Sequence, residues 1–320
     1  MDAEKLNIIA VVVTFNRLHL LQKNIACLRQ NKSLNEILVV NNGSTDGTLE
    51  WLDTQKDLWV IHQANVGGSG GFYVGIQEAY NRGADWIWCM DDDVFPRADC
   101  LANLLLHSNH IGVGILAPRR LMDGKVYTND FLSYNLVNPF SSMYGRKLKN
   151  MQVDAPIEIK GTAFEGPFIN RKVVERIGLP NKDLFIFCDD TDYCLRTILA
   201  GFAILYVPSA LMDKHRFFSN DSWSMRNHLK RWKRFYHIRN STYLNHHYGS
   251  NWGVQYLRGF IGMLGFVLTA LVVSPFTKAY TYADIPKFWR AYQDGIHERL
   301  ENTQIKILSR FCLCRLTYLN

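Results

Sequence analysis

The chain has 320 residues, enough for one large domain or for one domain with an appended module. Its apolar fraction of 48% and charged fraction of 20% are those of folded proteins and exclude a disordered chain. The formal charge of +7 suits a phosphorylated ligand, an anionic membrane or nucleic acid, so the position of the excess charge has to decide among them.

The N-terminal half alternates strand and helix patterns. Residues 8–14 are almost all apolar and β-branched, which is typical of a strand buried on both faces. The same patterns predict further strands at 36–40, 58–62 and 86–90, and helices at 18–30, 48–53 and 72–82. This order predicts an α/β fold with a mostly parallel sheet flanked by helices, which binds its ligand at the carboxyl ends of the strands.

A polar or glycine-rich turn follows each of these four strands. The turns cover residues 14–17, 41–46, 65–71 and 91–93. Because the carboxyl ends of parallel strands meet at one edge of a sheet, we expect the four turns to converge. Their convergence indicates a nucleotide site.

Three adjacent aspartates, Asp91, Asp92 and Asp93, follow the fourth strand. They repel one another unless a positive charge lies nearby. In an extended chain Asp91 and Asp93 point to the same side and Asp92 points away. The pair is therefore predicted to bind a hard divalent cation, Mn²⁺ or Mg²⁺, although an isolated Asp-x-Asp can also be a solvated turn.

The segment from Asn65 to Gly71 is a weaker signal. Its glycines, which include Gly67 and Gly68, would let the backbone approach a diphosphate, but a flexible turn explains them equally well. The segment matches neither G-x-G-x-x-G nor a P-loop.

The second half contains a loop-rich stretch from about 123 to 156, strand-like residues at 157–168 and a short helix at 172–177. The acidic residues Asp189 and Asp190 then precede a predicted helix at 193–200. They either cap the N-terminus of this helix or provide a general base. His215 is either structural or a third metal ligand, which would favour Mn²⁺.

The C-terminal third holds the basic excess. Residues 214–239 contain eight Lys or Arg and one acid, interleaved with aromatic residues that include Trp223 and Trp232. Residues 259–276 carry no formal charge. Three interpretations compete: a buried core helix, a helix lying in a membrane surface, and a short membrane span. No nucleic-acid-binding fold accompanies the basic residues, so nucleic acid is not an expected partner.

With these residues in place, the sequence resembles glycosyltransferase family 2 enzymes of the GT-A fold, especially bacterial galactofuranosyltransferases and rhamnosyltransferases. The resemblance covers residues 8 to 216, and its carrying segments are 11–17, 39–48, 65–72, 86–93, 189–193 and His215. It implies a catalytic domain at 1–216, with its acceptor side from about 157, and a basic helical region at 217–320.

The resemblance also implies residue roles. Asp91, Asp93 and His215 would bind the cation, and Asp190, with Asp189 beside it on the acceptor side, would be the catalytic base. The implied donor contacts are Thr14, Phe15, Arg17, Asn41, Asn42, Asn65, Gly67, Gly68, Asp91 and Asp92. Many family members have aspartate where this chain has Asn42, although asparagine can still hydrogen-bond a uracil edge.

The implied reaction is an inverting transfer of galactofuranose from UDP-galactofuranose to a glycan acceptor in the synthesis of a bacterial surface polysaccharide. The implied acceptors include lipid-linked glycans. A rhamnosyltransferase using dTDP-rhamnose is the alternative within the class. A nucleotidyltransferase or a non-catalytic sugar-nucleotide-binding module is the alternative outside it, but the turn after the first strand lacks the glycine that a nucleotidyltransferase needs.

We expect a cytoplasmic protein associated with the inner face of the cell membrane. Residues 1–5 lack the basic start of a signal peptide. The seven cysteines show no paired C-x-x-C spacing, which favours reduced thiols.

Overall fold

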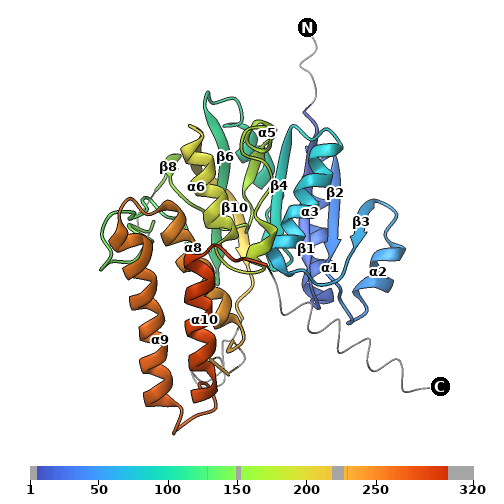
Figure 1. Ribbon diagram of the computed structural model, residues 1–320. Coiled ribbons are helices and arrows are strands. Elements are labelled where there is room, and N and C mark those ends of the chain that lie inside the picture. Colours follow the sequence, from blue (N-terminus) through green and yellow to red (C-terminus); the bar gives the residue numbers. More distant parts are fainter. Residues whose placement is uncertain (1–5, 128, 149–152, 218–226, 229, 302–320) are drawn as a thin grey trace, which may run out of the picture.

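The computed structural model describes residues 6–127, 129–148, 153–217, 227–228 and 230–301. Trp223 of the basic segment lies outside them. Within the described residues, ten strands form one sheet in the order β3-β2-β1-β4-β9-β6-β10-β5, with β7 paired to β6 and β8 paired to β10. Helices cover both faces of the sheet (Figure 1). The strands are β1 (Ile8–Thr14), β2 (Glu36–Asn41), β3 (Leu58–His62), β4 (Trp86–Asp91), β5 (Val94–Pro96), β6 (Val113–Met122), β7 (Lys125–Tyr127), β8 (Ile157–Ile159), β9 (Phe168–Asn170) and β10 (Ala203–Lys214).

The half of the sheet formed by β3, β2, β1 and β4 is parallel, as the sequence predicts. The apolar residues of β1, β2 and β4 are buried on both faces of the sheet. The other half is mixed, because β9 runs antiparallel to β4 and β6, and β5 runs antiparallel to β10. The fold is therefore a mixed α/β sheet, less uniformly parallel than predicted.

The helices around the sheet differ from the prediction mainly in where they begin. One face carries α1 (Leu18–Leu28), α2 (Thr48–Thr54) and α4 (Cys100–Leu105), and the other carries α3 (Gly67–Asn81), α5 (Arg171–Ile177) and α6 (Asp189–Leu199). The glycine-rich segment is the first turn of α3, and the acidic cluster is the first turn of α6. Both motifs thus lie on helix N-termini.

The C-terminal region is helical. It contains α8 (Lys233–Tyr248), a π-helical turn η2 (Gly253–Arg258), α9 (Gly259–Val273), a short 3₁₀ turn η3 (Tyr282–Asp284) and α10 (Ile285–Ile296). Helices α8, α9 and α10 share an apolar core and lie together beyond the edge of the sheet layer (Figure 1). Buried Arg239 of α8 donates hydrogen bonds to the carbonyls of Asp183 and Leu184, which ties this region to the sheet half of the molecule.

One helical stretch among the described residues, Gly253–Val273, is long and apolar enough to cross a membrane. It has 21 residues and a mean hydropathy of 1.9, and 22% of its most apolar window is buried. Its exposed side chains include Ile261, Leu264, Leu268 and Leu271, which recur at helical spacing. This exposure disagrees with the interpretation of the segment as a buried core helix.

Candidate active site

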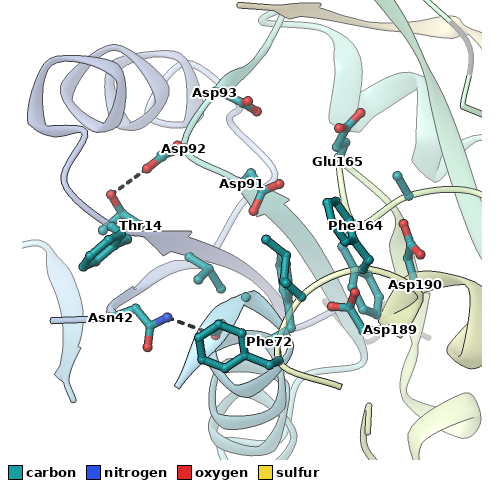
Figure 2. Close-up of a pocket in the computed structure, with 18 of the residues that line it drawn as sticks. Thr14, Asn42, Phe72, Asp91, Asp92, Asp93, Phe164, Glu165, Asp189 and Asp190 are labelled. Carbon is teal, nitrogen blue, oxygen red and sulfur yellow. Dashed lines mark hydrogen bonds between the residues drawn. The ribbon is translucent and has the colours of Figure 1, made fainter. Parts of the chain in front are cut away.

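A cavity of about 440 Å³ lies where the carboxyl ends of β1 and β4 meet the N-termini of α3 and α6. Figure 2 shows Asp91, Asp92 and Asp93 along one side and Asp189 and Asp190 across from them. The predicted site residues that line it are Thr14, Phe15, Arg17, Asn42, Asn65, Gly67, Gly68, Asp91, Asp92, Asp93, Asp189 and Asp190. The structure therefore brings together residues that are far apart in the sequence.

The three aspartates differ in their partners. Asp92 is buried and accepts a hydrogen bond from the Thr14 hydroxyl at 2.7 Å and one from Arg17 at 3.0 Å. Asp93 pairs with Lys214 at 3.1 Å and lies 3.6 Å from Arg17. Among the described residues, no hydrogen bond or ion pair reaches the carboxylate of Asp91. Asp92 thus anchors the turn, while Asp91 is left free to bind a ligand.

The charged side chains that line the cavity are mostly acidic. Six carboxylates line it, from Asp91, Asp92, Asp93, Glu165, Asp189 and Asp190, against two cationic side chains, Arg17 and Lys233. Burial raises the pKa of Asp91 well above its usual range, and the neighbouring Asp93 and Asp92 raise it further. A diphosphate would be repelled by such a surface unless a cation came with it. Oxygen donors with an unpaired carboxylate among them fit Mg²⁺ or Mn²⁺, which are commonly held by one or two carboxylates together with phosphate oxygens.

The structure does not assemble the predicted three-ligand set. Within the residues it describes, no group of three His, Cys, Asp or Glu side chains is arranged to hold a metal ion. The His215 amide donates a hydrogen bond to the carbonyl of Asp93, but the His215 ring packs edge-on against Phe217 at 4.6 Å. His215 is thus close to Asp93 through its backbone and is not among the residues that line the cavity, and its role as a metal ligand stays a prediction.

Asn41 and Asn42 have separate roles. Asn42 lines the cavity, where its side chain bonds to the carbonyl of Gly67 at 2.9 Å and accepts from Gln63 and from the Val66 amide. Asn41 is buried and does not line the cavity; it bonds to His62 at 3.1 Å and to the Ser44 amide at 3.0 Å. Adjacent residues at a strand end point to opposite faces, so only one of the pair faces the cavity. Asn41 is thus placed away from the cavity, and its contact with the donor stays a prediction.

The segment before α6 has an unusual backbone. Phe185, Phe187 and Cys188 all have positive φ angles, of 65°, 69° and 68°. Non-glycine residues with positive φ angles are uncommon and cluster at functional sites. Asn240 of α8 holds the segment by donating to the carbonyls of Leu184, Ile186 and Phe187 at 2.8 to 3.0 Å.

Gly67 lets α3 approach this strained segment. Its φ is +79°, and a Cβ built on it would lie 2.0 Å from the carbonyl oxygen of Phe185. The Ser69 amide donates to that oxygen at 3.2 Å. The first glycine of the run therefore serves close packing between two walls of the cavity.

Replacing Gly67 by alanine should lower the free energy of unfolding by about 1–3 kcal/mol or more, because the clash is with backbone and the φ is positive. Urea denaturation of both variants measures the effect. Gly68→Ala is the matched control, since Gly68 lines the same cavity and nothing lies within 4 Å of its built Cβ. Equal stability of the two variants would contradict the packing role.

Asp190 lies at the start of α6, with one carboxylate oxygen fixed by its neighbour. Its Oδ1 accepts from the Thr191 amide at 2.6 Å and from the Thr191 hydroxyl at 3.1 Å. Burial raises the pKa of Asp190 to about 6. Burial, with the charge of Asp190, raises the pKa of Asp189 to about 7. A carboxylate with a raised pKa and one uncommitted oxygen is suited to accept a proton near neutral pH.

Sequence reasoning missed part of the lining. Glu165 lies in the loop between β8 and β9 and pairs with Lys214 at 3.0 Å and with Arg120 at 2.8 Å. The other missed residues that line the cavity are Val13, Phe72, Asn129, Ala163, Phe164, Phe185, Ile186, Phe187, Trp232 and Lys233. The basic and aromatic composition around Trp232 and Lys233 is visible in the sequence, but the sequence alone does not place it at the cavity.

Comparison with known proteins identifies the family of this chain. A family model described as "Glycosyl transferase family 2" matches residues 9–178. The chain is 28% identical over 204 residues to galactofuranosyltransferase GlfT1 of Mycobacterium tuberculosis. This match covers 61% of this chain and 66% of that protein. It is 26% identical over 210 residues to dTDP-rhamnosyl transferase RfbF of Shigella flexneri, covering 64% of this chain and 68% of that protein. The match to GlfT1 spans just under two thirds of the length of that relative.

A solved structure shows the same fold. The crystal structure of GalNAc-T7 with UDP, GalNAc and Mn²⁺ superimposes with a TM-score of 0.56 at 15% identity, covering 84% of this chain and 58% of that one. The fold is thus GT-A-like, with a helical C-terminal region. The family model covers more than half of the chain and includes β1 to β4 with their turns. The chain belongs to glycosyl transferase family 2.

Proposed function

We propose that this glycosyltransferase transfers galactofuranose from UDP-galactofuranose, with inversion and with a divalent cation, to a glycan acceptor. The observation that carries the proposal is the cavity itself, in which Asp91 and Asp93 lie on one side and Asp190 on the other. A nucleoside diphosphate with its cation fits the side that carries Asp91 and Asp93. The acceptor hydroxyl needs a proton acceptor on the other side, where Asp190 lies. The first relatives reported above, which include a galactofuranosyltransferase, support this choice of donor.

The chain's own residues have distinct tasks in this proposal. Asp91 and Asp93 would hold Mn²⁺ or Mg²⁺, which when bound acts as a Lewis acid toward the leaving diphosphate. Arg17 and Lys233 line the same cavity and would add positive charge beside the phosphates. Asp190 takes the proton from the acceptor hydroxyl while that oxygen bonds to the anomeric carbon and the bond to the diphosphate breaks. Attack from the face opposite the diphosphate inverts the configuration.

The pH dependence follows from the raised pKa of Asp190. The base works only when ionised, so kcat should fall as pH drops through about 6, the pKa to which burial raises this group. An unperturbed aspartate would keep its activity down to about pH 4. The measurement is kcat at saturating donor, acceptor and Mn²⁺ between pH 5 and 8. A flat profile down to pH 5 would show that Asp190 is not the base.

A donor screen tests the proposed function. Release of UDP or dTDP is measured with UDP-galactofuranose, UDP-galactose and dTDP-rhamnose, with Mn²⁺ and with EDTA. We expect turnover of UDP-galactofuranose that EDTA abolishes. Preference for dTDP-rhamnose would instead support the second candidate, a rhamnosyltransferase, which the similarity to RfbF favours. Absence of turnover with any nucleotide sugar would reject both.

We further propose that the protein works at the cytoplasmic face of the cell membrane. The outward side of α9 exposes Leu264, Leu268 and Leu271, and exposed Trp252 precedes this helix. Apolar helices bordered by aromatic and basic side chains bind lipid surfaces. The basic excess of this region and the overall charge of +7 favour an anionic bilayer.

Binding to vesicles tests the membrane proposal. The full chain should co-sediment with vesicles that contain phosphatidylglycerol, and the double variant Leu264→Glu with Leu268→Glu should bind at least about fivefold less. Leu106→Glu is the matched control, because Leu106 is 72% exposed and follows α4 on the sheet half of the molecule. Equal binding by the wild type and the double variant would contradict the proposal.

A further inference from the structure

Helix α8 contacts the segment 183–192, which contains Asp190. The ring of Tyr236 in this helix stacks on the ring of Phe185, with 4.9 Å between their centroids. The match to the family model ends at residue 178, so α8 lies outside the part of the chain that the model covers. The surroundings of the proposed base are thus built partly by a region that the family match does not include.

The central contact is made by Asn240, whose side chain is completely buried. Its amide nitrogen donates to the carbonyls of Leu184, Ile186 and Phe187 at 2.8, 2.9 and 3.0 Å. A side-chain amide has two N–H groups, so the three carbonyls share them. The oxygen of the same amide accepts a hydrogen bond from Arg239 at 2.9 Å, which fixes its orientation. One side chain of α8 thus gathers three backbone carbonyls of the segment.

These hydrogen bonds explain how the segment keeps a strained backbone. Phe185, Phe187 and Cys188 have positive φ angles, which cost free energy in residues other than glycine. Carbonyls left without a donor would add to this cost. If the Asn240 amide were removed, we expect the segment to relax toward negative φ angles. Cys188 is the N-cap of α6, so this relaxation would move the first turn of the helix and Asp190 with it.

The donor side of the segment is held by a different element. The Ser69 amide, in the first turn of α3, donates to the carbonyl of Phe185 at 3.2 Å. Asn240 bonds instead to the carbonyls of the residues before and after Phe185. Loss of the Asn240 amide therefore leaves the link to α3 in place. We expect it to disturb the part of the segment that leads to Asp190 more than the donor side.

We propose that Asn240 is a positioning residue of the reaction, which fixes Asp190 where it can take the proton of the acceptor by holding the carbonyls before α6. The proposal rests on the proposed function, because it needs Asp190 as the base. Asn240 does not line the cavity, so it acts through the segment and not on the substrate. The catalytic unit then extends past residue 216 into α8, beyond the catalytic domain predicted from the sequence.

Replacing Asn240 by alanine tests the proposal, because it removes the amide and leaves the cavity lining unchanged. Thr242→Ala is the matched control. Thr242 lies on the same helix and is also buried, but it packs against Gly259 of α9 and Gly295 of α10. Both variants lose buried side-chain atoms, so both should melt below wild type. Only Asn240→Ala loses hydrogen bonds to the segment before α6.

Two quantities are measured at a temperature at which circular dichroism shows both variants to be folded. One is kcat for UDP release from UDP-galactofuranose, with saturating Mn²⁺ and with methyl β-galactofuranoside as the acceptor probe. The other is the Kd of UDP with Mn²⁺. Asn240→Ala should lower kcat by at least about tenfold, because a misplacement of about 1 Å in a catalytic group can cost about 10²-fold. Its Kd should stay within about threefold of wild type, and Thr242→Ala should keep both values.

This split separates positioning from a merely structural role. A loss of stability alone changes the melting temperature and leaves kcat of the folded protein unchanged. Asn240→Leu carries the same test if alanine leaves too large a hole for folding, since leucine is similar in size to asparagine and also lacks the donor. The proposal is overturned if the variant keeps kcat within about twofold of Thr242→Ala, or if kcat and UDP affinity fall together.

The activity of wild type separates this proposal from the one on which it rests. If wild type releases no UDP from UDP-galactofuranose in this assay, the proposed function is wrong and the role of Asn240 falls with it. If wild type is active and the Asn240 and Thr242 variants behave alike, only the positioning role is wrong.

Discussion

Replacing Asp190 by asparagine should lower kcat by about 10²–10⁴-fold, the usual contribution of a positioned general base. Asparagine has nearly the same shape and can still accept the hydrogen bonds from the amide and hydroxyl of Thr191. It cannot take a proton from the acceptor. The donor side of the cavity is unchanged, so the Kd of UDP with Mn²⁺ should stay within about twofold of wild type.

Asp183→Asn is the control for this experiment. Asp183 is exposed, lies a few residues before α6 and does not line the cavity. It should retain wild-type kcat. If Asp190→Asn transferred sugar as fast as the control, Asp190 would have no part in proton transfer.

The second large effect on activity is expected from changes to Asp91 and Asp93, which lie across the cavity from Asp190. Replacing Asp91 or Asp93 by asparagine should weaken Mn²⁺-dependent UDP binding by at least about tenfold and lower kcat by about 10²-fold or more. The reason is electrostatic: without the cation, the carboxylates repel a diphosphate. Loss of Asp91 should have the larger effect, because the carboxylate of Asp93 is already paired with Lys214 at 3.1 Å.

Calorimetry with UDP, with and without Mn²⁺, measures both variants. Asp53→Asn is the matched control, because the Asp53 side chain is 63% exposed and outside the cavity. Binding of UDP that was equally tight in EDTA and in Mn²⁺ would reject the metal site. It would assign the diphosphate to Arg17 and Lys233 instead.

The sequence predicts that several of these side chains meet in one cavity, for a physical reason. Thr14, Asn42 and Asp91 each lie at or just after the end of a parallel strand, and the adjacency of β1, β2 and β4 brings those ends together. Strand burial and turn chemistry are local properties, so they can be recognised without knowing the fold. Side chains alternate between the two faces of a strand, so the sequence also indicates that Asn41 and Asn42 point in opposite directions.

Other parts depend on tertiary contacts and could not be predicted. Glycine has a low helix propensity, so the sequence predicts a turn at the run from Gly67, whereas the structure begins α3 there. The contact of α3 with β1 requires glycine there, since a Cβ on Gly71 would lie 2.5 Å from Val13. Lys233 and Trp232 reach the cavity because α8 packs against the segment before α6, a contact without a local signature.

A crystal structure with UDP and Mn²⁺ would test the central claim most directly. We predict the cation at Asp91 and Asp93, the diphosphate beside Arg17 and Lys233, and an open path from the β-phosphate to Asp190. A nucleotide bound in another cavity, or a diphosphate bound away from Asp91 and Asp93, would contradict the account.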